Sequence, residues 1–140
     1  MKIAIGCDEN ARDRMQDLIE VMEEKGIEYK VFEVEGDYPD VAREVCLAVQ
    51  EKSYDRGVLV CGTGLGMAIC ANKFKGLRAA VCHDLYSAQR SILSNDCQIL
   101  AMGAFIIGPK LAQEIMKAWL DIERTGGTVA KVKKIEQLEK

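Results

Sequence analysis

The sequence has few of the features that mark a specialised class of protein. Its 140 residues include a single histidine, two prolines and one tryptophan, and its net charge is only −3. So small a charge gives no sign of a polyanionic partner such as a nucleic acid. No apolar run approaches the roughly 18–20 residues of a membrane-spanning helix, and the apolar stretch after Met1 is too short for a signal peptide. We therefore expect a cytoplasmic protein that binds neither nucleic acid nor membrane.

The six cysteines also lack a pattern that would give them a common role. They form no CxxC pair, and none has zinc-ligand spacing with the single histidine, His83, so we expect no metal site. Four of them lie in apolar runs and are interpreted as reduced, buried side chains: Cys46, Cys70, Cys82 and Cys97. Cys7 and Cys61 differ because each ends a predicted strand.

Short apolar runs alternate with helical patterns along the chain, without a linker or a repeat. The patterns predict strands at 2–6, 28–34, 56–61, 77–82 and 97–102, and helices at 11–25, 39–52, 65–74, 84–93, 109–123 and 128–139. Such alternation is typical of βαβ units and a parallel sheet. We expect a single α/β domain over residues 1–140, with a five-stranded parallel sheet and a basic, amphipathic C-terminal helix.

The most informative segment is RGVLVCGTGLG, residues 56–66, which has the pattern of a buried strand, a glycine-rich turn and a helix start. Such a turn aims backbone N–H groups at one point, where negative charge is stabilised. The Cys61 thiol and the Thr63 hydroxyl border it. The motif is neither a dinucleotide fingerprint nor a P-loop, since it follows the third strand and lacks GK[ST]. A plain tight turn remains the alternative to a ligand-binding loop.

In open parallel sheets, ligands collect beyond the carboxyl ends of the strands. Cys61 and Asp8 both lie there. Cys61 could be a nucleophile or a proton-transfer base, and the second role is more economical because no Cys–His pair is evident. Asp8 could serve the site or cap the next helix. His83 could lie near the site or on the surface, and whether Asn95, which precedes the last strand, reaches this edge stays open.

Several motifs together resemble the ribose-5-phosphate isomerase B and galactose-6-phosphate isomerase family. They are KIAIGCDE at 2–9, DYPDVA at 37–42, GVLVCGTGLGMAICANKFKGLRAAVCHDLYSAQ at 57–89, SND at 94–96, MGAFIIG at 102–108 and GG at 126–127. The resemblance implies a Rossmann-like αβα sandwich that works as a homodimer or tetramer, with sites shared between subunits. It also implies aldose–ketose isomerisation through a cis-enediolate, without metal or cofactor.

The resemblance also implies roles for individual residues. Cys61 would be the base that moves the carbon-bound proton, Thr63 would help to move the oxygen-bound proton, and Asp8 would hold sugar hydroxyls and assist ring opening. The enediolate oxygen would be held by the Asn95 side chain and by the backbone of the loop, at Gly62, Gly64, Leu65 and Gly66.

The departures from the family pattern concern phosphate and the sugar ring. Glu9 stands where the family usually has histidine, and Ser94 replaces the ring-opening histidine. Phe105 and Thr128 replace phosphate-binding arginines, and Lys131 is the only stand-in for a further cation. Neither Phe nor Thr can replace the planar fork of arginine.

We therefore expect an aldose–ketose isomerase for a small sugar or sugar phosphate, with only weak activity on ribose 5-phosphate. Its preferred substrate would be shorter, open-chain, or held by its anionic end elsewhere. The alternative is a non-catalytic or partner-dependent sugar-binding subunit of a heteromeric isomerase. The retained Cys61, Thr63 and Asn95 argue for the enzyme, because a subunit without turnover has no chemical need for them.

Overall fold

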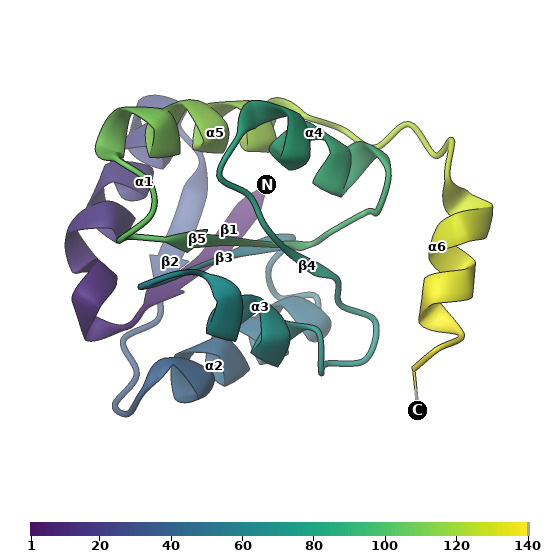
Figure 1. Ribbon diagram of the computed structural model, residues 1–140, viewed down its shortest axis with the longest axis horizontal. Coiled ribbons are helices and arrows are strands. Elements are labelled where there is room, and N and C mark those ends of the chain that lie inside the picture. The colour runs from purple at the N-terminus through teal and green to yellow at the C-terminus, as the bar shows by residue number, and fades with distance from the viewer. Residues whose placement is uncertain (140) are drawn as a thin grey trace.

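A computed structural model describes residues 1–139 and shows a parallel sheet between two layers of helices (Figure 1). In chain order the elements are β1 (Lys2–Cys7), a single 3₁₀ turn η1 (Glu9–Ala11), α1 (Arg12–Glu24), β2 (Glu28–Val31), α2 (Tyr38–Gln50), β3 (Arg56–Cys61), α3 (Leu65–Ala71), β4 (Ala79–Val81), α4 (Leu85–Leu93), β5 (Ile99–Gly103), α5 (Pro109–Asp121) and α6 (Val129–Glu136). The predicted α/β fold, with its five parallel strands and its C-terminal helix, is confirmed.

The order of the strands places the main functional candidates together. The sheet runs β2-β1-β3-β5-β4, and every neighbouring pair is parallel. The chain first builds outward from β1 to β2 and then returns to the other side of β1 with β3. The carboxyl ends of β1 and β3 therefore flank the switch point of the sheet, where open α/β sheets bind their ligands.

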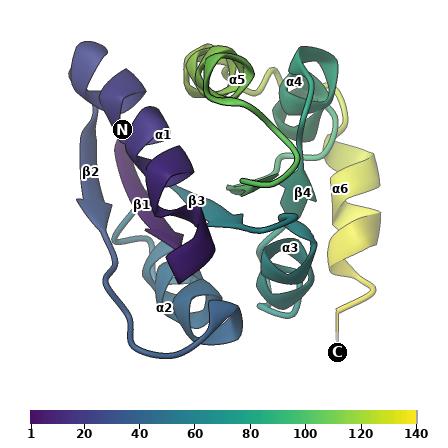
Figure 2. The same cartoon turned by 60° about the vertical axis from the view of Figure 1, so that its left-hand side comes forward.

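Each face of the sheet has its own hydrophobic core. Helices α1, α4 and α5 cover one face, and α2 and α3 cover the other (Figures 1 and 2). Alternate residues of β3 serve the two cores: Val58 and Val60 pack under α1 and α5, whereas Leu59 and Cys61 pack against α2 and α3. Burial on both faces explains why this strand is a continuous apolar run.

Several elements are shorter than their sequence patterns predict, among them β4, predicted over 77–82, and α6, predicted over 128–139. The helix predicted over 65–74 ends at Ala71 because the Asn72 side chain exchanges two hydrogen bonds with the backbone of Ala79, at 2.9 and 3.0 Å. The strand predicted over 28–34 pairs only as far as Val31. Beyond it the Phe32 N–H still reaches the Ile5 carbonyl at 2.8 Å, while the Phe32 ring packs edge-on against Tyr54.

Helix α6 stands apart from the other helices, beyond the β4 edge of the sheet (Figure 1). Its only fully covered side chain is Val132. Polar contacts hold it in place: Arg78 pairs with Glu136, and the Glu139 carboxylate accepts from the Gly76 N–H at 2.8 Å.

All six cysteines are free, and Cys46, Cys82 and Cys97 are buried as expected, whereas Cys70 is only half-buried. Among the helices formed by residues 1–139, none combines the length and the apolar character that crossing a bilayer requires.

Candidate active site

The glycine-rich loop after β3 is locked against the end of β5. Gly64 has a φ of +78°, and a Cβ there would lie 2.9 Å from the Met102 carbonyl carbon. A Cβ on Gly103 would lie 2.6 Å from the Thr63 backbone. Two hydrogen bonds join the segments, since the Cys61 and Gly62 carbonyls accept from the N–H groups of residues 104 and 105 at 2.8 and 3.0 Å. Only glycine permits so close an approach, so the loop has one well-defined shape.

Within this loop the Cys61 sulfur faces the loop backbone. Its Sγ accepts a hydrogen bond from the Gly64 N–H at 3.2 Å, and the residue is only 5% exposed. The N–H groups of Gly62 and Thr63 have no hydrogen-bond acceptor among residues 1–139. Unpartnered amides beside a thiol form a place where an anionic oxygen can be stabilised next to a base.

The Thr63 side chain is exposed at the mouth of the loop. Its Oγ1 accepts from the Leu65 N–H at 3.2 Å, which fixes the oxygen and leaves the hydroxyl proton free to be donated. Gly66, in the first turn of α3, lies against the Tyr38 ring, so closely that no Cβ would fit between them. The loop therefore presents a thiol, a hydroxyl and backbone amides on one short stretch of chain.

Asp8 joins this edge from the neighbouring strand. Its N–H donates to the Val60 carbonyl at 3.1 Å, and one carboxylate oxygen caps η1 by accepting from the Asn10 N–H at 3.1 Å. The capping role weighed in the sequence is thus present, and the second oxygen stays free for a ligand. Glu9 follows as an exposed side chain with no cation within 4 Å among residues 1–139.

Cys7 is the other thiol at this edge. It is half-buried, and burial raises the pKa of its thiol to about 11. A thiol that stays protonated near neutral pH is a poor base.

His83 is partly buried at the carboxyl end of β4, and its Nε2 accepts a hydrogen bond from the Gly103 N–H at 2.9 Å. Desolvation lowers the pKa of the His83 imidazole, and the nearby Asp84 carboxylate opposes this shift. The imidazole therefore supports the carboxyl end of β5, against which the glycine loop packs. The sequence placed His83 at a strand end but left its neighbourhood open, because nothing local indicates a bond to another strand.

Ser94 and Asn95 lie at the opposite end of the sheet, near the amino ends of the strands. Cys61 pairs with Gly103 at the carboxyl end of β5, whereas Asn95 precedes the amino end of that strand. Four residues of register separate the two ends, which corresponds to roughly 13 Å. Lys131 is exposed on α6 and is also remote from the loop. Within one chain the structure therefore does not bring Ser94, Asn95 or Lys131 to Cys61.

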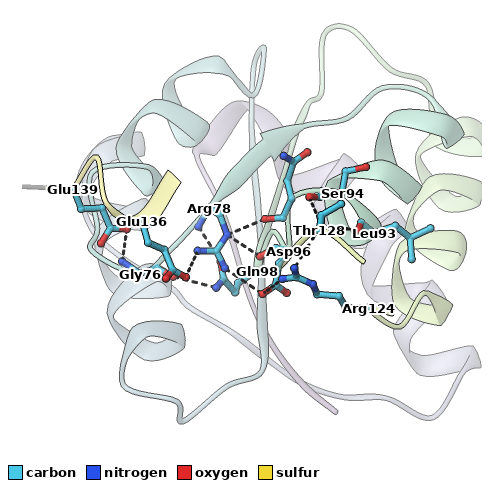
Figure 3. Close-up of polar contacts among 11 residues, drawn as sticks. Gly76, Arg78, Leu93, Ser94, Asp96, Gln98, Arg124, Thr128, Glu136 and Glu139 are labelled. Carbon is cyan, nitrogen blue, oxygen red and sulfur yellow. Dashed lines mark hydrogen bonds and ion pairs between the residues drawn. The ribbon is translucent and has the colours of Figure 1, made fainter. Parts of the chain in front are cut away.

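The Ser94–Asp96 turn is held by side-chain hydrogen bonds and ion pairs (Figure 3). Arg78, only 7% exposed, donates to the carbonyls of Asn95 and Asp96 at 2.8 and 3.1 Å and pairs with the Asp96 carboxylate at 3.3 Å. Arg124 pairs with the same carboxylate at 2.6 Å. Asp96 itself has a positive φ of 50°, a conformation that this network stabilises. No local pattern indicates a role for Arg78 or Arg124, because both contact residues distant in the chain.

Large apolar side chains are exposed around the glycine loop. They come from α2, α3 and the segment after β5: Tyr38, Leu65, Ile69, Phe105 and Ile106. Phe105 is 72% exposed, and its ring covers Gly62, 3.0 Å from where a Cβ would stand. A contiguous apolar surface beside a candidate site is typical of a surface that another protein chain covers.

No three or more His, Cys, Asp or Glu side chains within residues 1–139 are grouped so that they could hold a metal ion.

Known proteins match this chain over nearly its whole length. The family model described as Ribose/Galactose Isomerase matches residues 3–138. A Listeria innocua protein named ribose-5-P isomerase B is 49% identical, covering 99% of this chain and 97% of its own. A Pectobacterium atrosepticum D-erythrulose-4-phosphate isomerase is 46% identical, covering 99% and 95%. The solved structure of Clostridium thermocellum ribose-5-phosphate isomerase B superposes with a TM-score of 0.94 at 40% identity, covering 99% and 97%.

Proposed function

The chain belongs to the ribose/galactose isomerase family and is an aldose–ketose isomerase of sugar phosphates, and from that premise we propose that its substrate is an open-chain four-carbon sugar phosphate. The reaction would be the interconversion of D-erythrulose 4-phosphate with its aldose, the activity named for one of the relatives.

The observation that carries this proposal is the residue at position 94. The resemblance places the ring-opening histidine there, and this chain has Ser94, whose Oγ accepts from the Arg90 Nε at 2.7 Å. His83 is the only histidine in the sequence. Its Nε2 is engaged by the Gly103 N–H, and it follows β4, which β5 separates from the strand of Cys61. The chain therefore has no histidine at the position from which the resemblance expects the ring to be opened.

The chemistry of short sugars removes the need for such a group. Ribose 5-phosphate closes a furanose ring through its O4 hydroxyl, and an isomerase must open that ring before it can act. In a tetrose 4-phosphate the same oxygen carries the phosphate, so the furanose cannot form. A site without the histidine loses little with the four-carbon substrate and much with the five-carbon one.

The isomerisation itself would be carried by the loop after β3. The Cys61 thiolate takes the proton from the carbon next to the carbonyl, and the electron pair of that C–H bond forms the enediolate. The free amides of Gly62 and Thr63 stabilise the oxygen that gains charge. The Thr63 hydroxyl passes the proton between the two oxygens, and Cys61 returns its proton to the neighbouring carbon. Atoms and charges balance without a cofactor.

The distance between the two edges of the sheet supports a homodimer. Asn95, the side chain expected to bind the enediolate, cannot reach Cys61 of its own chain. A second copy that covers the exposed apolar surface of Leu65, Ile69 and Phe105 could bring its Ser94–Asp96 turn to this loop. Each dimer would then hold two complete sites, as the family resemblance implies.

A comparison of two substrates tests the proposed substrate. We expect kcat/KM for D-erythrulose 4-phosphate to exceed that for ribose 5-phosphate by more than about tenfold, a part of the 10²–10⁴-fold that a positioned acid contributes. Ser94→His should raise the activity with ribose 5-phosphate. Ser53→His, the same change on an exposed turn, is the control and should not. Equal use of both sugars by the parent enzyme would refute the proposed substrate.

A further inference from the structure

Two positions where the resemblance expects a ring-opening histidine and a phosphate-binding arginine carry hydroxyls, and the structure joins them. The Thr128 Oγ1–H donates to the Ser94 carbonyl at 2.7 Å (Figure 3). The segment before α6 is thereby fastened to the C-terminal end of α4. An arginine at 128 would have placed a positive charge at this junction, and the hydroxyl of Thr128 does not.

Two guanidinium groups from elsewhere in the chain reach the same junction. Arg90, in the last turn of α4, donates from Nε to the Ser94 Oγ at 2.7 Å. Arg124 approaches from the other side, with its Nη2 3.5 Å from the Thr128 Oγ1. The positive charge absent from position 128 is therefore supplied nearby, by side chains from two other segments of the chain.

The Arg90 guanidinium is not neutralised by a neighbour. No carboxylate lies within 4 Å of it among residues 1–139, and only its Nε has a hydrogen-bond partner in that part of the chain. The residue is also partly buried, at the C-terminal end of its helix. A half-buried arginine whose two terminal nitrogens are free is prepared for an oxyanion, because its planar fork donates two parallel bonds to one.

Arg124 is partly neutralised but keeps unused hydrogen-bonding capacity. Its Nη1 pairs with Asp96 at 2.6 Å, and its Nε is buried without a partner among residues 1–139. Asp96 divides its charge between Arg124 and Arg78, and Arg78 also pairs with Glu136. Arg78 and Arg124 thus share two carboxylates, and the unpaired Arg90 adds one positive charge in excess at the junction.

We infer that Arg90 and Arg124 form the subsite for the anionic end of the sugar, in place of the arginines that this chain lacks. The ligand group is a phosphate monoester on a short open-chain sugar. The inference deepens the proposed function and rests on it, since the junction would face the Cys61 loop of a second copy. Ser94 is smaller than the histidine that the resemblance expects, and the guanidiniums of Arg90 and Arg124 lie beside the Ser94 and Thr128 hydroxyls.

The preference of the enzyme for a phosphorylated over an unphosphorylated sugar tests the subsite during turnover. kcat/KM is measured for D-erythrulose 4-phosphate and for unphosphorylated D-erythrulose, in the parent and in Arg90→Gln. We expect the ratio of the two values to fall by about 10–100-fold, the range for losing a hydrogen bond to a charged group. Arg90→Lys, which keeps the charge but not the fork, should give an intermediate ratio. Lys117→Gln, which removes one charge from an exposed ion pair on α5, should leave the ratio unchanged.

The ratio separates binding of the anion from a structural role. An Arg90 that only fastened the end of α4 would lower kcat/KM for both sugars by the same factor, and that outcome would overturn the inference. Arg90→Gln is the deciding variant because Arg90 holds no ion pair among residues 1–139 whose loss would loosen the turn. Arg124→Gln is expected to lower the ratio further in the double variant.

Binding of inorganic phosphate tests the subsite independently of turnover. Phosphate is titrated into the intact protein and into Arg90→Gln and followed by ³¹P line width. We expect binding by the parent that weakens at least about tenfold in the variant. Equal binding would overturn the inference even if the enzyme proves active on four-carbon sugars. If the parent turned over no four-carbon sugar phosphate, the proposed substrate would fail, and this titration alone would decide the subsite.

Discussion

Two ends of the sheet carry the candidate residues: the loop edge, at the carboxyl ends of the strands around Cys61, and the ionic edge, at the amino ends around Asn95. Different interactions stabilise them. The loop around Cys61 is shaped by glycines, backbone hydrogen bonds and close approach, with almost no charge. The turn around Asn95 is shaped by arginines and carboxylates from the turn itself, the residue before β4, α6 and the segment between α5 and α6. Backbone packing fixes where the chemistry happens, whereas a network of side chains can change its charges without disturbing the fold. Three of the five family departures, Ser94, Thr128 and Lys131, lie away from the loop, whereas Glu9 and Phe105 lie beside it.

Removing the sulfur at the loop edge should have the largest effect. We expect Cys61→Ala to lower isomerisation by about 10²–10⁴-fold, the contribution of a positioned base, while the protein stays folded. Exchange of solvent deuterium into the substrate measures the proton transfer directly. Cys70→Ala, which removes a half-buried thiol from the same segment, is the control and should exchange normally. Near-normal exchange by the Cys61 variant would remove this thiol from the mechanism.

Breaking the ionic edge should cost stability as well as activity. Arg78→Met removes a buried guanidinium that serves two carbonyls and two carboxylates. We expect the free energy of unfolding to fall by about 2–3 kcal/mol, the range for hydrogen bonds to charged groups, because the carboxylates are half-exposed and regain water. Urea unfolding measures this, with Arg43→Met, which removes an exposed ion pair on α2, as the control.

The same Arg78 variant also tests whether the two edges cooperate. With the turn loosened, kcat/KM should fall while the Cys61 loop, on the other edge, keeps its structure. A variant that is less stable but fully active would show that the position of Asn95 does not matter for catalysis.

A larger side chain at the loop edge should lower the stability of the protein through steric overlap alone. Gly103→Ala would place a methyl group 2.6 Å from the Thr63 backbone, and backbone atoms cannot yield as a flexible side chain does. We expect a loss of about 1–3 kcal/mol in unfolding free energy, typical of overpacking. Gly108→Ala is the matched control, since a Cβ there meets nothing within 4 Å. Equal stabilities for the two variants would contradict the close approach of the loop and β5.

How well the sequence predicts each edge depends on whether contacts local in the chain or distant in the chain form that edge. The strand ending at Cys61 and the glycine turn after it are local patterns, so the fold class and the loop could be predicted. Nothing local predicts where the switch point of the sheet lies, or that Arg78 reaches Asp96, because both depend on strand order and register. The end of α3 was missed for a similar reason, since Asn72 binds a strand that comes later in the chain. A site that a second copy of the chain completes is harder still to predict from the pattern of one sequence.

The smallest expected effect concerns the His83 imidazole, which supports the loop edge through the Gly103 N–H. Because desolvation lowers the pKa of His83 below its ordinary value of 6.5, the unfolded chain takes up a proton there more readily than the folded chain does. The stability contributed by neutral His83 is therefore present above about pH 6.5 and is lost as the pH falls through the folded pKa. Protonation would also remove the acceptor from the Gly103 N–H.

The pH dependence of His83→Gln isolates that contribution. Urea unfolding of the parent and the variant at about pH 7.5 and about pH 5 brackets the ordinary histidine pKa. We expect the parent to lose more stability than the variant over this interval, since glutamine cannot titrate but can still accept from the Gly103 N–H. Parallel losses would show that groups other than His83 carry the whole pH dependence. In that case the loop edge would be insensitive to pH, and the contrast between the two edges would be sharper.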